Sequence, residues 1–257
     1  MLRMKKSIFV ILTVLVLLFS ATIQAEAPAD SAGSADAAAF RKVRNVVPFG
    51  RYEQDNNPSN GPEPIQWIVL DYEKEENKAL LLSRYGLEAR PYNTESVAIT
   101  WENCTLRKWL NSEFLLSAFS AEEQAAILMT NVDNSASQGY SEWDMDGGNN
   151  TRDQIFLLSY AEANQYLKVV YNDRNNVKAR VEPTAYAIAQ GAMVSRNYKT
   201  ADRKACGWWW LRSPGDGWPF IVAIVSPGGK LRNRGVYLGE GVARPAMWVN
   251  LNSDIFN

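Results

Sequence analysis

The residues best suited to chemistry lie near the C-terminal end of the chain, between positions 216 and 237. They combine aromatic, cationic and amide side chains, which recognition surfaces use as rigid anchors and adaptable polar contacts. The candidate ligand-binding residues are Asp216, Trp218, Phe220, Lys230, Arg232, Asn233, Arg234 and Tyr237. Glycines among them permit the tight turns that several short loops need. The segment therefore predicts a binding surface, and ordinary solvated loops are the alternative.

The composition argues against most catalytic machinery. The chain contains 0 histidines, which excludes Ser-His-Asp and Cys-His catalysis and zinc sites built on imidazole. Glu88, Glu95 and Glu102 are carboxylates that glycoside hydrolysis could use, but that reaction needs two carboxyl groups about 5–9 Å apart. Scattered acids usually belong to the surface. We therefore expect no catalytic residues.

One polar segment has the composition of a calcium site. Residues 144–150, with an aspartate beyond them, alternate oxygen ligands with a glycine turn, as calcium loops do. The candidate metal ligands are Asp144, Asp146 and Asp153. The segment is not an EF-hand, because Ile155 stands where the bidentate glutamate would be. A solvated loop is the alternative, and we expect no other cofactor.

The chain has 2 cysteines, Cys104 and Cys206. An exported protein meets oxidising surroundings, so the two could form a disulfide. Their separation in sequence does not show whether their Cβ atoms meet. A disulfide and two unpaired thiols both remain open.

The N-terminal region has the layout of a secretory signal peptide. Three cationic residues precede an apolar stretch at 7–19, and small residues follow. We expect a signal peptide at 1–25 with cleavage after Ala25, a retained N-terminal anchor being the alternative. Residues 26–45 predict a flexible linker, and residues 46–257 a single domain. The expected location is secreted or in the cell envelope.

The charge balance narrows the choice of partner. The formal net charge is -1 and no long basic run occurs, which argues against nucleic acid. Contact with a membrane is expected only through the export signal or a retained anchor. An extracellular protein or glycan is therefore the expected partner.

The elements that must position these residues alternate without regular strand–helix periodicity, which predicts the α+β class. Residues 65–72 and 78–84 read as paired strands, and 220–225 as a core strand. Residues 105–119 predict a helix capped by Thr105, and Ser120 and Ser159 each predict a further helix start. Residues 131–153 predict a polar loop and 154–158 a short buried strand. In the run Trp208, Trp209 and Trp210 we expect core packing with at most one ring exposed to water.

Several short sequence motifs resemble those of a bacterial family, domain of unknown function 6273. They are FGRYEQ (49–54), PIQWIVLD (64–71), LLLSRYGLEARPYN (80–93), TWENCTLRKWLN (100–111), IFLLSYAEA (155–163), WWLRSPG (209–215) and RPAMWVNL (244–251). Two departures occur. An alanine, Ala243, separates Val242 from Arg244, and Cys104 stands where a small hydroxyl residue is common, so we expect Cys104 to be incidental.

The resemblance implies a C-type-lectin-like fold, in which short antiparallel sheets and flanking helices support a loop-rich C-terminal surface. Formylglycine-generating enzymes and retroelement variable proteins share this fold. In the variable proteins the region between the WWLRSPG-like and RPA-like words carries the diversified residues. By position, this implies a binding surface at 216–221 and 230–237. The alternatives are an oxidase of the formylglycine-generating type and a structural envelope or assembly protein.

Overall fold

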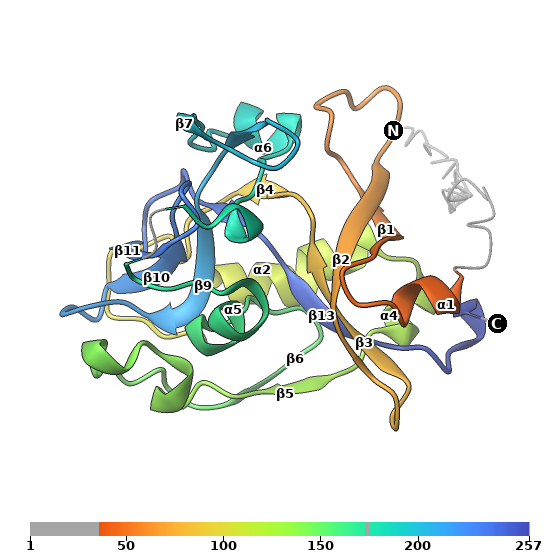
Figure 1. The fold of residues 1–257 in the computed structure, drawn as a ribbon, viewed down its shortest axis with the longest axis horizontal. Helices are drawn as coiled ribbons and strands as arrows, with labels where there is room; N and C mark the ends of the chain where they lie inside the picture. Colours follow the sequence, from red (N-terminus) through yellow and green to blue (C-terminus); the bar gives the residue numbers. More distant parts are fainter. Residues whose placement is uncertain (1–35, 173–174, 257) are drawn as a thin grey trace, which may run out of the picture. The chain divides into compact units, whose positions relative to one another are not determined.

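The computed structural model describes residues 36–172 and 175–256 (Figure 1). It is a mixed α+β structure with mostly antiparallel, curled sheets and few helices. The expected signal peptide lies outside the described residues, as does the first half of the expected linker, residues 26–35. Among the described residues, no helix is both long enough and apolar enough to cross a membrane.

A four-stranded antiparallel sheet joins the beginning of the domain to its end. Its order is β1-β2-β3-β13, with β1 at Val46–Tyr52, β2 at Glu63–Glu73, β3 at Lys78–Ser83 and β13 at Ala246–Asn250. Alternate residues of β2, namely Ile65, Trp67 and Val69, are fully buried, as the period of two in a half-buried strand requires. The predicted strands at 65–72 and 78–84 are confirmed.

A second sheet carries the C-terminal candidates. Its order is β11-β10-β9-β12-β4, with β11 at Leu231–Gly235, β10 at Ile221–Val225, β9 at Trp209–Pro214, β12 at Val242–Ala243 and β4 at Glu88–Ala89. Within this sheet, as far as the structure describes it, β12 and β9 run parallel and the other pairs antiparallel. Two small ribbons pair β5 (Thr130–Val132) with β6 (Thr151–Asp153) and β7 (Ser195–Lys199) with β8 (Ala205–Cys206). The predicted core strand at 220–225 is confirmed as β10.

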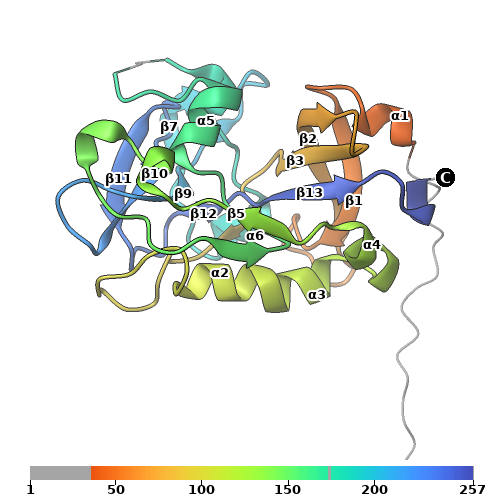
Figure 2. The same ribbon diagram turned by 90° about the horizontal axis from the view of Figure 1, so that it is seen from below.

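The predicted helix at 105–119 is one continuous rod with a widened turn in its middle (Figure 2). It consists of α2 (Thr105–Trp109), the π-helical turn η1 (Leu110–Phe114) and α3 (Leu115–Ala118). The other helical elements are α1 (Ala37–Phe40), α4 (Ala121–Ala126), η2 (Ala136–Gln138), η3 (Ser141–Trp143), α5 (Tyr160–Leu167), η4 (Val177–Ala179), α6 (Ala185–Ala189) and η5 (Asp254–Phe256). Capping boxes at Ser120 with Glu123 and at Ser159 with Glu162 begin α4 and α5 as predicted.

The N-cap of α2 is Cys104 and not Thr105. The Cys104 Sγ accepts the backbone N–H of Arg107 at 3.4 Å, as a serine or threonine hydroxyl would at that position. The Thr105 hydroxyl instead accepts the backbone N–H of Thr94 at 3.1 Å. The expectation that Cys104 is incidental was therefore wrong.

Two segments between α4 and α5 also differ from the prediction. The polar stretch at 131–153 begins and ends in paired strands, β5 and β6, because its ends lie side by side and satisfy each other's backbone groups. Residues 154–158 form no strand and make only an isolated bridge between Phe156 and Ala246. Asn111 binds this segment instead, since its Oδ1 accepts the N–H groups of Gln154 and Ile155 at 2.9 and 3.1 Å.

The packed part of the chain begins earlier than the expected boundary at 46. Helix α1 lies inside the segment predicted to be a linker, and Phe40 at its end is buried. The ring of Phe40 packs edge-on against those of Phe49 and Phe256, at 6.3 and 4.9 Å between centroids. A large apolar residue at the end of the alanine-rich stretch therefore extends the core into it.

The tryptophan run at the start of β9 belongs to the core. Trp208, Trp209 and Trp210 are all buried, and Trp208 and Trp210 share a face, with ring centroids 4.7 Å apart. The indole N–H of Trp209 donates to the Ala179 carbonyl and that of Trp210 to the Arg90 carbonyl. The core-packing interpretation is confirmed, and none of the three rings is a binding platform.

Candidate functional site

The hairpin formed by β10 and β11 brings the two predicted binding segments together. The antiparallel register pairs Ile221 with Gly235, so the loop before β10 and the turn after β11 meet at the same end. The backbone N–H of Val236 donates to the Phe220 carbonyl at 3.0 Å. The loop between β9 and β10 projects from the sheet beside this end (Figure 1). Residues 216–220 and 232–237, which we call the C-terminal surface, are therefore continuous.

Two aromatic side chains of the C-terminal surface face solvent. Trp218 is 61% exposed and Tyr237 is 51% exposed. Trp218 stacks on the half-buried ring of Phe220, with centroids 5.8 Å apart. All nine tryptophans lie in the described residues, and Trp218 is the only exposed one among them. The other eight indole rings are buried or partly buried, whereas the Trp218 ring is in contact with solvent.

The two arginines of β11 share a face because they are two residues apart on a strand. Arg234 is exposed and sits opposite Val222. The Arg232 guanidinium lies 4.8 Å from the ring centroid of Tyr171, and its Nη1 donates to the Tyr171 carbonyl at 3.0 Å. Arg232 is thus partly engaged in packing, while Arg234 is the freer of the two for a ligand.

The remaining candidates are not all in one place. Asp216 is exposed in the loop beside Trp218. Asn233 lies on the opposite face of β11 from the arginines, where its Cβ approaches Gly215. Lys230 is at the far end of the hairpin, next to the turn at 226–229. Five strand residues, about 16 Å at roughly 3.3 Å each, separate Lys230 from the turn that holds Tyr237.

A hollow beside the C-terminal surface was not foreseen from the sequence. Its volume is about 210 Å³. Its lining residues are Ala136, Gly139, Tyr140, Ser141, Trp143, Asp144, Met145 and Pro214. We call it the aromatic hollow. Pro214 ends β9 and directly precedes the loop that carries Trp218, so the hollow and the C-terminal surface adjoin.

A cluster of aromatic rings supports the aromatic hollow. Tyr140 packs edge-on against Trp143 and Tyr160, in both cases with 5.4 Å between centroids, and stacks on Tyr171 at 5.8 Å. These rings come from the 131–153 segment, from α5 and from the stretch after it. No local pattern links them. The only sequence signal was the presence of tyrosine and tryptophan inside an otherwise polar loop.

Arg212 holds the wall of the aromatic hollow in place. Its side chain is 3% exposed, and its guanidinium donates to the carbonyls of Asp133 and Leu157 at 3.0 and 2.8 Å. It also forms an ion pair with Glu162 of α5 and a hydrogen bond to Asn134 Oδ1 at 3.2 Å. One buried cation therefore ties β9, α5 and the hollow's loop together.

Comparison with known proteins identifies the family. The sequence model of the family described as Domain of unknown function (DUF6273) matches residues 76–251. This chain belongs to that family. No curated protein matches the chain, and no solved structure matches it. The DUF6273 match spans β3 to β13 and so contains both the C-terminal surface and the aromatic hollow.

The three aspartates predicted as calcium ligands in the DUF6273 domain have separate environments. Asp153 is buried and accepts from Trp101 Nε1 at 2.9 Å and from Arg107 Nε at 2.7 Å. Asp146 accepts the backbone N–H of Gly148 at 2.9 Å, and Asp144 is an exposed residue of the aromatic hollow. Within the described residues they do not form a group with converging oxygens. The structure does not bring them together, and calcium at this loop stays a prediction.

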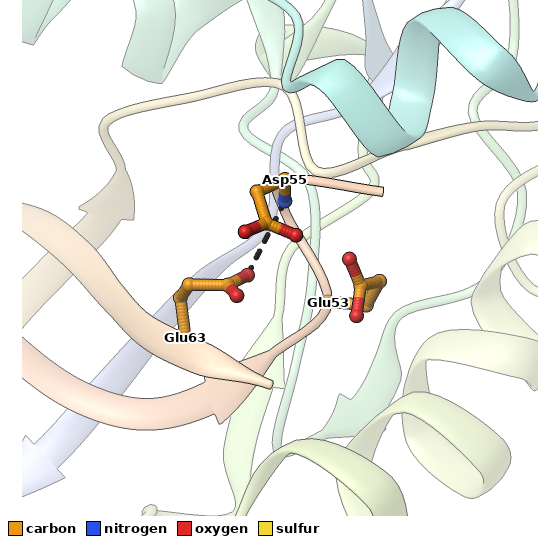
Figure 3. Close-up of side chains that lie close together, drawn as sticks. All are labelled: Glu53, Asp55 and Glu63. Atoms are coloured by element: carbon orange, nitrogen blue, oxygen red, sulfur yellow. Dashed lines mark hydrogen bonds between the residues drawn. The ribbon is translucent and has the colours of Figure 1, made fainter. Parts of the chain in front are cut away.

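Another carboxylate group lies outside the matched DUF6273 range. Oxygens of Glu53, Asp55 and Glu63 all lie within 4.8 Å of one another, as Figure 3 shows. Backbone N–H groups donate hydrogen bonds to these carboxylates: Glu63 accepts from Gln54 at 2.7 Å, and Glu53 accepts from Asn57 at 2.9 Å. The group therefore orders the loop between β1 and β2.

The two thiols of the DUF6273 domain are buried and not joined in a disulfide. Burial raises the pKa of Cys104 to about 12 and also raises the pKa of Cys206. A reactive cysteine has a lowered pKa and partial exposure, so neither thiol has that character. Glu88, one of the carboxylates considered for hydrolysis, is buried and bound to Tyr52 and Arg90.

Proposed function

We propose that this protein is an exported bacterial binding module that recognises an extracellular protein or glycan through the C-terminal surface. The observation that carries the proposal is the pairing of β10 with β11, which gathers Trp218, Phe220, Arg234 and Tyr237 at one end of a hairpin. Exposed aromatic rings beside an arginine are the anchors that interfaces favour.

The frame beneath this surface supports recognition. The flanking strand β9 is buried through its tryptophans, so the loop before β10 rises from a rigid base. A rigid base lowers the entropy lost when a loop binds. This division between a packed sheet and an aromatic loop is what leads us to propose a C-type-lectin-like fold for the domain. The export signal proposed for residues 1–25 would bring the surface into contact with extracellular ligands.

A binding role without catalysis is part of the proposal. It is supported by the absence of histidine from the sequence and by the raised pKa values of both buried thiols. An oxidase of the formylglycine-generating type would need an accessible thiolate. No observation on the described residues favours that alternative or a purely structural envelope role.

The test uses the full chain on an array of bacterial and host glycans and extracellular proteins. The triple variant Trp218→Ala, Arg234→Ala, Tyr237→Ala removes the exposed anchors. A matched control, Leu116→Ala with Ile188→Ala, removes exposed apolar side chains elsewhere, 69% and 47% exposed. We expect the triple variant to bind the array ligand at least about tenfold more weakly, which corresponds to about 1.4 kcal/mol. The control should bind like the wild type.

Two results would overturn the proposal. One is equal binding by the wild type and the triple variant. The other is the absence of any ligand on an array that covers both glycans and extracellular proteins.

A further inference from the structure

We infer that the aromatic hollow binds one neutral sugar ring of a glycan. This inference rests on the proposed binding function, whose ligand class it narrows. It goes beyond that function by assigning a ligand-binding role to Tyr140, Ser141, Trp143 and Asp144, which lie outside the C-terminal surface.

The size of the aromatic hollow suits one ring. Its volume of about 210 Å³ is below the roughly 300–1,000 Å³ of pockets that enclose drug-sized ligands. A peptide segment or a nucleotide would not fit inside it. A single six-membered ring with small substituents would, and the rest of a longer ligand would have to lie outside.

The lining suits a ligand that is apolar on its faces and polar around its edge. Tyr140, Trp143 and Pro214 supply apolar walls, and Ser141 and Asp144 supply a hydroxyl and a carboxylate. Pockets of this kind orient a ligand through a few polar groups set among aromatic ones. A sugar ring has the matching distribution, because its C–H groups form apolar faces and its hydroxyls donate hydrogen bonds outward. The carboxylate of Asp144 can accept two of them.

The charges of the lining argue against an anionic ligand. The residues that line the hollow include one acid, Asp144, and no lysine or arginine. Arg212 lies behind the wall, but its charge is paired with Glu162. A phosphate or carboxylate ligand would therefore meet a like charge without a free cation to bind it.

The arrangement of the rings argues against a quaternary-ammonium cage. Such a cage holds its rings apart around a cation. Here Tyr140 packs directly on Trp143 and on Tyr171, with centroids 5.4 and 5.8 Å apart. These rings contact one another instead of standing apart around a space, so they form a wall and not a cage.

The position of the hollow links it to the C-terminal surface. Pro214 lines the hollow, and the loop carrying Trp218 begins two residues later, at Asp216. A glycan whose end ring occupies the hollow and whose next rings pass Pro214 would reach the loop that carries Trp218. The two sites would then bind one chain in succession, which raises affinity through effective concentration.

The experiment is saturation-transfer NMR on the full chain with methyl β-glucoside, methyl β-galactoside and methyl N-acetyl-β-glucosaminide. Choline and inorganic phosphate serve as cationic and anionic probes. Gly139→Leu places a side chain at the lining, where an added Cβ would meet only the Ala136 carbonyl oxygen, at 3.4 Å. Ser137→Leu adds the same side chain at an exposed residue of η2 that does not line the hollow.

We expect saturation transfer to at least one glycoside, reduced at least fivefold by Gly139→Leu and unchanged by Ser137→Leu. Ala136→Leu is a second filling variant if Gly139→Leu fails to fold. The inference is overturned if no glycoside receives saturation, if the filled hollow transfers as well as the wild type, or if only choline or phosphate responds. In those cases array binding that still depends on Trp218 would leave the proposed function standing, so the two failures are distinguishable.

Discussion

The guanidinium of Arg232 lies 4.8 Å from the ring centroid of Tyr171, and its Nη1 donates to the Tyr171 carbonyl at 3.0 Å across 61 positions of sequence. Tyr171 in turn stacks on Tyr140 of the aromatic hollow. The hairpin that carries the C-terminal surface and the loop that forms the hollow are therefore joined through one cation and one ring.

Arg232→Ala should lower the free energy of unfolding by about 1–2 kcal/mol, because it removes a cation–π contact and a hydrogen bond. Arg234→Ala, its neighbour on the same face, is exposed and should stay within about 0.5 kcal/mol of the wild type. Urea unfolding of both variants measures the difference. Equal losses in the two variants would contradict the assigned role of Arg232.

Arg212→Met should lower the free energy of unfolding by roughly 3–5 kcal/mol, because Glu162 and several carbonyls lose a buried cationic partner. Arg244 offers a contrast. It is also buried, but burial lowers its pKa to about 9 and its Nη1 has no hydrogen-bond partner among the described residues. Replacing an unpaired buried charge by an apolar side chain also removes a desolvation penalty.

We therefore expect Arg244→Met to cost less than about 2 kcal/mol, since it loses mainly the bond to the Ser83 carbonyl and the contact with Trp209. Thermal and urea unfolding of the two variants would show the order. A larger loss for Arg244→Met than for Arg212→Met would mean that pairing is not what distinguishes the two arginines.

Gly229→Ala should be strongly destabilising. The backbone of Gly229 has a φ of +87°, and an added Cβ would lie 1.9 Å from the carbonyl oxygen of Asn176. Gly217→Ala is the matched control, because its φ is +78° but, apart from its chain neighbours, no atom of residues 36–172 and 175–256 lies within 4 Å of the added Cβ. Backbone strain alone should lower the free energy of unfolding of the control by about 1–2 kcal/mol. Gly229→Ala should exceed it by a further 1–3 kcal/mol or more, and similar melting temperatures would refute the clash.

Cys104 should make stability depend on pH in the alkaline range. Burial raises its thiol pKa from 9.0 to about 12, so the folded state keeps a proton that the unfolded state loses. Its contribution is fully present below about pH 9 and is lost as the pH rises toward 12. Cys104→Ser keeps a side-chain acceptor at the N-cap but does not ionise.

The advantage of the wild type over Cys104→Ser should therefore shrink progressively between about pH 9 and 11. Urea unfolding at several pH values measures it, and the difference between the two proteins cancels the contributions of titratable groups that do not interact with Cys104, which leaves the thiol and its partner Tyr92. A difference that does not change with pH would show that the thiol titrates alike in both states.

Local patterns predicted much of the framework correctly. Alternating apolar residues in β2, the capping serines of α4 and α5, and the apolar runs of β3 and β10 each act over a few neighbouring positions. Their physical cause, side-chain burial with a fixed period or an N-cap hydrogen bond, is readable within such a window. The stretch at 154–158 misled for the same reason, because a short apolar run has no period that separates a strand from a buried loop.

The sequence by itself determined the α+β class, the core role of the tryptophan run and the position of the exposed aromatic segment around Trp218. Only the tertiary structure decided which candidates lie at the same end of the β10–β11 hairpin: Trp218 and Tyr237 are at one end, and Lys230 is at the other. It also decided that Asp153 accepts hydrogen bonds from Trp101 and Arg107 instead of facing a metal site. The hollow lined by Tyr140, Trp143 and Pro214 likewise comes from the tertiary structure. These groupings join residues from distant segments, and contacts between distant segments depend on the packing of the whole core, which no local pattern encodes.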